Sequence, residues 1–173
     1  RGGIQSYLEG LWSALPAERS FVVAGTQPGD RAWDVLQAFS IRRAPARAWT
    51  YPRWRAAWAS ARALVQENNI EVIVCGKALF EGRAALRLQR EFGLPYVVCT
   101  YALEVREWLK GRKTAKDLRA VLRGAARVLV IHEETKRLLR SLGVAEKVLV
   151  KLYPGVAEEF FGVPENLQEF RRR

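Results

Sequence analysis

The chain has 173 residues, 49% of them hydrophobic, and its 29 lysines and arginines outnumber 18 aspartates and glutamates. This hydrophobic content argues against a disordered chain, and the net charge of +11 favours an anionic partner: nucleic acid, acidic lipid or a phosphorylated metabolite. One histidine and two cysteines without C-x-x-C spacing predict neither a metal site nor a disulfide framework.

The first third of the chain contains two predicted helices and two predicted strands. Apolar residues at steps of three and four from Ile4 to Leu15 predict a helix that Pro16 ends. A buried strand is predicted at 21–26 (FVVAGT) and a second strand at 35–41 (VLQAFSI). Pro52 suits the first turn of a helix, whose apolar stripe runs on to Val65.

The rest of the chain alternates regularly between strands and helices. Strands are predicted at 71–76, 95–101, 127–132 and 147–153, and helices at 82–92, 114–125 and 133–142. Thr114 and Asp117 resemble a capping pair. Strands of near-continuous valine, isoleucine and leucine between amphipathic helices predict an α/β Rossmann-like three-layer sandwich with a mainly parallel sheet.

Two features of the amino terminus predict a fragment. Domains of this type begin with a buried strand, whereas this chain begins at what reads as the loop after it. The chain also has no methionine, even at position 1. We therefore expect the first strand of the sheet to be missing from residues 1–173.

The cysteines, Cys75 and Cys99, are expected to be buried free thiols in a reducing compartment. The sequence has no span of about 20 apolar residues and no signal-peptide pattern, which predicts a cytoplasmic protein.

Candidate ligand contacts lie directly after the predicted strands, because such sheets bind ligands beyond the carboxyl ends of their strands. Lys77 follows one of these strands and is interpreted either as a contact for a phosphate group or as a rim charge. Gly2 and Gly3 precede the first helix, whose unpaired N–H groups suit a phosphate. A tight turn would also select glycine, so their spacing alone leaves both interpretations open.

Four motifs carry a resemblance through their order and spacing. They are GGIQSYLEGLWSAL, GLPYVVCTYALEV, AARVLVIHEETKRLLRSLGV and KVLVKLYPGV, with Phe161 shortly after. Together they resemble the amino-terminal half of the group 1 (family four) glycosyltransferases, retaining enzymes with the GT-B fold. The resemblance implies that residues 1–162 form a Rossmann-like acceptor-binding domain. It also implies that 163–173 begin the linker to a carboxyl-terminal donor-binding domain. Without that domain, this chain would have no catalytic activity.

The resemblance also implies roles for individual residues. Gly2 and Gly3 match the family's cleft loop, which faces the donor diphosphate and the transferring sugar. Tyr101 stands where the family has histidine, and a phenol with a pKa of about 10 is a poor proton acceptor. His132 stands where the family has serine, and is either a strand-end residue with a satisfied hydrogen bond or the source of the imidazole that Tyr101 lacks.

Two groups of candidate residues follow from these positions. Tyr101 and His132 are the candidate catalytic residues. Glu104 either binds an acceptor hydroxyl or a basic neighbour, or is a solvated loop carboxylate. The candidate acceptor-binding residues are Lys77, Glu104, Arg106 and Thr135.

Arginines alternate with aromatic residues over 39–64, a composition typical of membrane-surface elements. The alternative is that the tryptophans pack inward, as the helical spacing of Trp54 and Trp58 favours. Arg42, Arg43 and Trp49 are therefore the membrane-surface candidates. The basic stretch 106–116 is a further candidate contact for an anionic acceptor or headgroup.

The predicted function is transfer of a sugar, with retention, from a nucleotide-sugar donor to a sugar or lipid-linked acceptor. The nucleotide sugar is a co-substrate held mostly by the other half, and no cofactor or metal is expected in this half. A peripheral contact with the inner face of the membrane is compatible with this function. The alternative is a non-catalytic basic Rossmann-like module that binds membrane or nucleic acid, although an RNA-recognition strand with aromatic residues is lacking.

Overall fold

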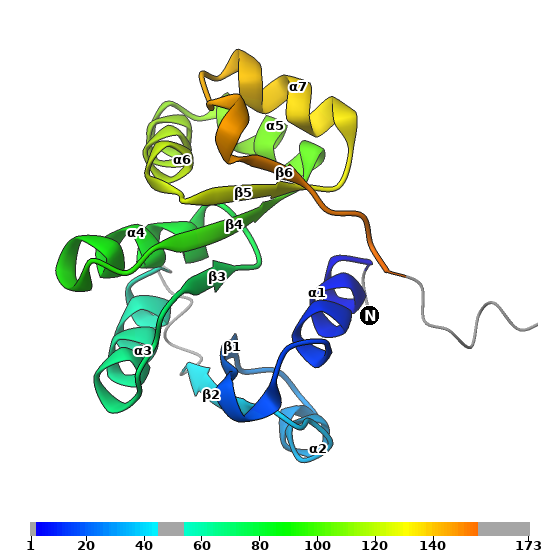
Figure 1. Cartoon of the computed structure of the whole chain (residues 1–173), viewed down its shortest axis with the longest axis vertical. Coiled ribbons are helices and arrows are strands. Elements are labelled where there is room, and N and C mark those ends of the chain that lie inside the picture. Colours follow the sequence, from blue (N-terminus) through cyan, green and yellow to red (C-terminus); the bar gives the residue numbers. More distant parts are fainter. Residues whose placement is uncertain (1–2, 45–53, 156–173) are drawn as a thin grey trace, which may run out of the picture.

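The protein, seen in a computed structural model that describes residues 3–44 and 54–155, is a mixed α/β domain (Figure 1). The first part of the chain contains α1 (Gly3–Ser13), β1 (Phe21–Gly25), α2 (Asp30–Asp34), β2 (Ser40–Ala44) and α3 (Trp54–Glu67). β3 (Ile73–Cys75), α4 (Phe80–Phe92), β4 (Tyr96–Thr100), α5 (Ala102–Lys110) and α6 (Arg112–Gly124) follow. The last elements are β5 (Arg127–Val130), α7 (Glu133–Ser141) and β6 (Leu149–Lys151), with short 3-10 turns η1 (Ala17–Arg19) and η3 (Glu146–Val148).

All strand pairs among the described residues are parallel, which confirms the predicted sheet type. β1 pairs with β2, and a separate sheet has the order β3-β4-β5-β6. An exposed ion pair of 3.0 Å between Arg19 and Glu71 joins the segments that lead into β1 and β3. No described strand pairs with both β1 and β3, so the two sheets are separate among the described residues, and the missing first strand stays a prediction.

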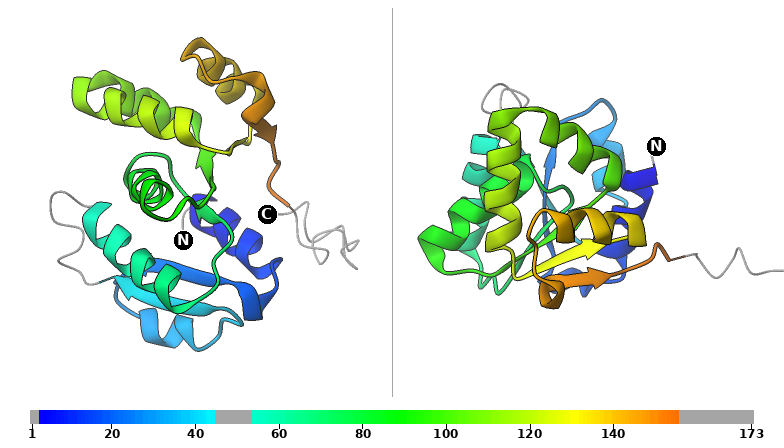
Figure 2. Two further views of the ribbon diagram at one scale, coloured as in Figure 1. Left: turned by 60° about the vertical axis from the view of Figure 1, so that its left-hand side comes forward. Right: turned by 90° about the horizontal axis from the view of Figure 1, so that it is seen from above.

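Helices cover the sheets on both faces, as the three-layer prediction requires. α4, α5, α6 and α7 lie on one side of β4–β6, and α1 lies on the other (Figure 1). At the smaller sheet, α2 and α3 lie on opposite faces (Figure 2), and α3 also packs against α4. None of the helices in the described part of the chain is long and apolar enough to cross a membrane.

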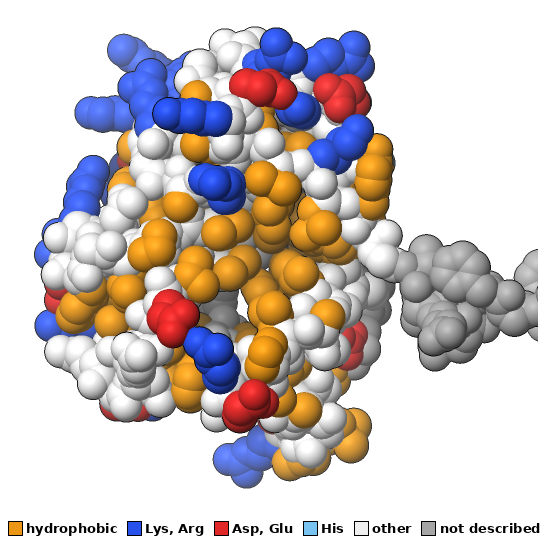
Figure 3. Space-filling model, in the orientation of Figure 1, with side chains coloured by type: hydrophobic (Ala, Val, Ile, Leu, Met, Phe, Trp, Pro, Cys, Tyr) orange, Lys and Arg blue, Asp and Glu red, His pale blue; other side chains and the backbone are white. Residues whose placement is uncertain are grey.

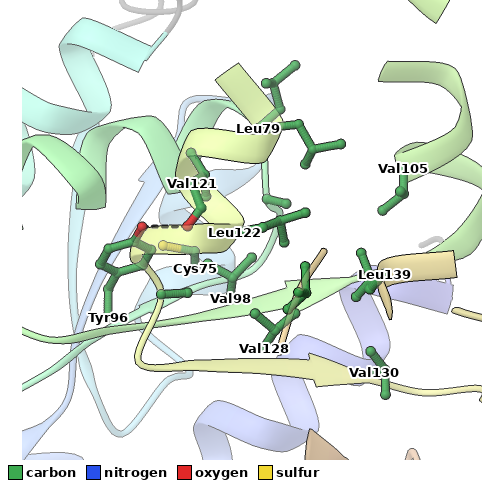
Figure 4. Packing of buried hydrophobic residues seen from close by; sticks show 14 of the residues in the cluster. Cys75, Leu79, Tyr96, Val98, Val105, Val121, Leu122, Val128, Val130 and Leu139 are labelled. Atoms are coloured by element: carbon green, nitrogen blue, oxygen red, sulfur yellow. Dashed lines mark hydrogen bonds between the residues drawn. The ribbon is translucent and has the colours of Figure 1, made fainter. Parts of the chain in front are cut away.

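The hydrophobic core lies between the larger sheet and the helices α4, α5, α6 and α7 (Figure 4). Tyr96 is fully buried there, and its hydroxyl donates a hydrogen bond of 2.6 Å to the Val121 carbonyl. Gly82 allows α4 to approach α6, because a Cβ at this position would lie 2.5 Å from a Val121 methyl group. Cys75 and Cys99 are buried free thiols, as predicted, and burial raises the pKa of Cys99 to about 12.

The segment 27–44 differs from its prediction. The expected strand at 35–41 is wrong: Val35 and Leu36 are 81% and 79% exposed, directly after α2, and the strand starts at Ser40. The reason is local. Gly29 adopts a left-handed backbone, and the Asp30 carboxylate accepts a hydrogen bond from the Gln27 N–H, so a short helix begins here.

The segment 101–125 contains one helix more than predicted. α5 occupies the stretch read as polar, and α6 begins at Arg112. Thr114 and Asp117 are therefore not a capping pair: the Thr114 hydroxyl donates to the Trp108 carbonyl, and Asp117 forms an ion pair with Arg83. The predicted linker at 163–173 lies outside the described residues.

Candidate functional site

A cavity of about 460 Å³ lies where the carboxyl ends of β4, β5 and β6 face the first turns of α1. All three strands end at this rim because they are parallel, so the residues that follow them come together. Among the described residues, the side chains that line the cavity are uncharged. They are Gly3, Ile4, Ser6 and Tyr7 from α1, with Tyr101, Ile131, Pro154 and Gly155 from the rim.

The amino terminus of α1 contributes the positive end of a helix dipole. Gly3 is the first residue of this helix, lines the cavity and is exposed. The backbone N–H groups of a first helical turn have no partner within the helix and carry partial positive charge. A Cβ added at Gly3 would meet nothing within 4 Å, so packing against the described residues does not require glycine here. Gly2 lies outside the described residues.

Tyr101 follows β4 and occupies the N-cap position of α5 with extended backbone angles. Its side chain is 7% exposed, and its buried hydroxyl has no hydrogen-bond partner among the described residues. Burial raises the pKa of Tyr101, and the neighbouring Cys99 and Tyr7 act in the same direction. The phenol is therefore protonated at neutral pH and can donate a hydrogen bond to a ligand, but it cannot serve as a base there.

Tyr7 is a second phenol in the same cavity, and the sequence placed it only on an apolar helical stripe. Its hydroxyl is also buried without a partner among the described residues, and its pKa is raised by burial and then by Cys99. Tyr7 and Tyr101 both line the cavity, and each has a buried hydroxyl without a partner among the described residues, an arrangement that is costly for a buried polar group. A polar tip on an otherwise apolar stripe was the only signal in the sequence.

Two predicted acceptor-binding residues form an ion pair next to the rim. Lys77, after β3, places its Nζ 3.1 Å from Glu104 Oε1, in the first turn of α5. The other Glu104 oxygen is buried and has no hydrogen-bond partner among the described residues. Glu104 therefore binds a basic neighbour, one of the alternatives that the sequence left open, and this pair is not among the groups that line the cavity.

Glu81, which the sequence did not single out, lies beside this pair. One of its carboxylate oxygens accepts a hydrogen bond of 2.5 Å from the Lys77 backbone N–H. Desolvation is the main cause that raises the pKa of Glu81 to about 7, with the negative charge of Glu104 adding to it and Lys77 opposing it. The group is therefore close to half-protonated at neutral pH.

The other predicted site residues lie around the rim in different environments. His132 is exposed at the N-cap position of α7, and it is the preceding residue, Ile131, that lines the cavity. Arg106 forms an exposed ion pair with Glu134. Thr135 is fully buried in the first turn of α7. Their roles in catalysis or acceptor binding stay predictions.

The predicted membrane-surface arginines are engaged within the protein. Arg42 pairs with Glu67. Arg43 pairs with Asp34 and Asp30, and it also donates a hydrogen bond of 2.6 Å to the Gly25 carbonyl. The third candidate, Trp49, lies outside the described residues.

Comparison with known proteins places this geometry in context. A family model described as a glycosyl transferase 4-like domain matches residues 2–154, which include every described residue that lines the cavity except Gly155. No curated protein matches the chain. Over the described parts of the chain, no group of three or more histidine, cysteine, aspartate or glutamate side chains is placed to hold a metal ion.

Proposed function

Because the chain belongs to the glycosyl transferase 4-like family, we propose that it is the acceptor-side half of a retaining glycosyltransferase that uses a nucleotide sugar. The observation that carries this proposal is the uncharged cavity between the first turn of α1 and the carboxyl rim of the sheet, with its two unpartnered phenols. Such a cavity suits the hydroxyl-rich ring of a sugar, which offers several hydrogen-bond acceptors and donors and carries no charge.

The first turn of α1 is assigned to the donor's diphosphate. A helix amino terminus favours an anion through its dipole and its free N–H groups. The missing Cβ at Gly3 leaves open space through which a phosphate group could approach the backbone. Charge that develops on a leaving diphosphate is stabilised in the same way, so the helix end would act in the transition state as well as in binding.

Tyr101 and Tyr7 are assigned to orientation of the sugar. Both hydroxyls are buried, and the raised pKa of each keeps it protonated, so each can donate a hydrogen bond to a sugar oxygen. Holding the reacting groups in position is itself a large part of catalysis in transfer reactions. His132 is retained in the proposal as the imidazole at the same rim, one residue beyond the cavity-lining Ile131.

Most of the donor would be bound by a second lobe. Among the described residues, those that line the cavity include no lysine or arginine that could neutralise a diphosphate. A cytoplasmic location belongs to the same proposal and is supported by the free, buried thiols of Cys75 and Cys99. The acceptor is proposed to be a sugar or a lipid-linked sugar.

The test is an assay of the full-length protein that carries this chain, with a panel of nucleotide sugars and candidate acceptors. The proposal expects acceptor-dependent release of a nucleoside diphosphate from at least one donor. Proton NMR of the product would then give the anomeric configuration, which should be that of the donor. Folded full-length protein that binds no nucleotide sugar and releases no diphosphate with any donor would favour the non-catalytic module instead.

A further inference from the structure

Four basic side chains follow one line along the outer surface of α6. They recur at steps of four, three and four residues, so they share one helical face, and all are exposed: Arg112, Lys116, Arg119 and Arg123. We call these four the α6 row. The row is about 16 Å long at 1.5 Å per residue. The helix is held in place by its opposite surface, where Ala115, Leu118, Val121 and Leu122 are buried.

The charge of the α6 row is not neutralised within the described part of the chain. No ion pair there involves any of its four members, and the one acid on the helix, Asp117, pairs with Arg83 of α4. The predicted membrane arginines differ in this respect, because Arg42 and Arg43 both have carboxylate partners. Figure 3 shows lysine and arginine side chains gathered over α6 at the upper left of the molecule.

The shape of the surface around the row favours a flat partner. α6 packs against both α4 and α5. Its exposed face is therefore part of the surface of a broad layer of helices, and α6 does not protrude from that layer. Arg87 and Arg90 of α4 are also exposed and extend the basic surface beside it. The exposed face of α6 carries no aromatic side chain on which a nucleotide base could stack.

From these observations we propose that the α6 row binds an anionic lipid bilayer. Clusters of four or more lysines and arginines on an amphipathic helix are attracted to acidic headgroups, without any need for a membrane-spanning segment. α6 and α1 lie on opposite sides of β4–β6 (Figure 1), so docking through α6 leaves the cavity beside α1 open to substrates.

The test compares the full-length protein with a variant that carries Arg112→Gln, Lys116→Gln, Arg119→Gln and Arg123→Gln. Glutamine has nearly the same helix propensity as lysine and arginine, and all four positions are exposed, so the fold is expected to persist. The matched control removes the same charges at dispersed exposed positions: Arg31→Gln, Arg127→Gln, Arg137→Gln and Lys147→Gln. Circular dichroism and the thermal midpoint establish that each variant is folded.

Binding is measured by flotation with vesicles of phosphatidylcholine alone and with added phosphatidylglycerol. The wild type and the dispersed control should bind only the acidic vesicles, and more weakly at high salt. Each cation of the α6 row should contribute about fivefold, so the row variant should bind at least about a hundredfold more weakly.

Three results would overturn the proposal. The first is equal binding of the wild type and the row variant to acidic vesicles, and the second is an equal loss in the dispersed control, which would make net charge alone responsible. The third is a row variant that loses affinity for single-stranded RNA while its binding to vesicles is unchanged. That result would identify nucleic acid as the partner.

Discussion

Lys77 and Glu104 follow neighbouring parallel strands, and their side chains meet at 3.1 Å although they lie far apart in sequence. Their side chains are 41% and 21% exposed, so solvent screens the attraction only in part. Lys77→Met should lower the free energy of unfolding by about 1–2 kcal/mol, because it leaves the half-buried Glu104 carboxylate without its cation. The double variant Lys77→Met/Glu104→Gln should be less destabilised than the sum of the single changes.

The measurement for this pair is a double-mutant cycle by urea unfolding. A coupling energy of about 1 kcal/mol is expected for a pair with this exposure. Strict additivity of the two single changes would show that the contact contributes nothing to stability.

Glu81 should make stability fall as the pH rises toward neutrality. Its pKa is 4.5 in the unfolded chain and about 7 in the folded protein, so between these values the folded state binds a proton that the unfolded state has released. Stability from this group is complete below pH 4.5 and is lost as the pH rises through 7. The groups that face the carboxyl are the Lys77 N–H and ammonium, which favour the charged form, and the Glu104 carboxylate, which opposes it.

The variant Glu81→Gln removes this titration and keeps an oxygen that can accept from the Lys77 N–H. Thermal midpoints of wild type and variant should be similar at pH 4.5, diverge as the pH rises toward 7 and differ by a nearly constant amount above it, where the variant is the more stable by at most about 3 kcal/mol. Parallel pH profiles for the two proteins would rule out Glu81 as the titrating group.

Tyr101→Phe should increase stability while it decreases activity. The phenol hydroxyl is buried without a partner among the described residues, so its removal should raise the free energy of unfolding by about 1 kcal/mol. If the hydroxyl binds substrate, kcat/KM of the full-length enzyme should fall by about tenfold, as expected for the loss of one hydrogen bond. Tyr7→Phe should behave in the same way.

Tyr96→Phe is the matched control, because its hydroxyl donates to the Val121 carbonyl within the core. This change should lower the free energy of unfolding by about 1–2 kcal/mol and leave kcat/KM unchanged. A loss of stability in Tyr101→Phe comparable with that in Tyr96→Phe would mean that Tyr101 is a structural residue.

Gly3→Val should abolish turnover of the full-length enzyme and leave stability nearly unchanged. A side chain at this position meets no described atom within 4 Å, but it would occupy the space next to the first helical turn that a diphosphate needs. Gly10→Val, seven residues along the same helix and also without a neighbour within 4 Å, is the control and should retain activity. Steady-state kinetics and thermal unfolding of both variants give the comparison, and an unchanged rate in Gly3→Val would assign the glycine to the turn alone.

The sequence predicted those helices and strands whose own hydrophobic pattern identifies them. It missed the elements whose assignment depends on contacts with residues distant in sequence. The strand 95–101 and the helix 82–92 were recognised because their hydrophobic periods match one element type. α5 was missed although Ala102, Val105 and Trp108 recur at helical steps of three, because four of its nine residues are charged and the stretch reads as a polar loop. Val35 and Leu36 were assigned to a strand because composition does not reveal exposure, although Gly29 before Asp30 marked a turn.

The candidate site shows the same division. The order of strands and loops predicts that Tyr101 lies at the carboxyl rim of the sheet, and Tyr101 lines the cavity there. Tyr7 could not be separated from the other apolar residues of its helix, because the state of its hydroxyl depends on atoms distant in sequence. The same holds for the ion-pair partners of Arg42 and Arg43 and for the burial of Glu81. They depend on residues that are distant in sequence, and these contacts cannot be predicted from a single sequence.

The separation of the two sheets has a consequence for work with this chain alone. β1 pairs with β2 along one edge, and β3 pairs with β4 along one edge. No strand in 3–44 or 54–155 pairs with the second edge of either strand. A row of free amide and carbonyl groups is a template for any extended polypeptide, including a second molecule of the same kind. The associated fraction of the purified chain should therefore increase with protein concentration. An added apolar peptide that pairs with the unpaired edges of β1 and β3 should decrease this fraction.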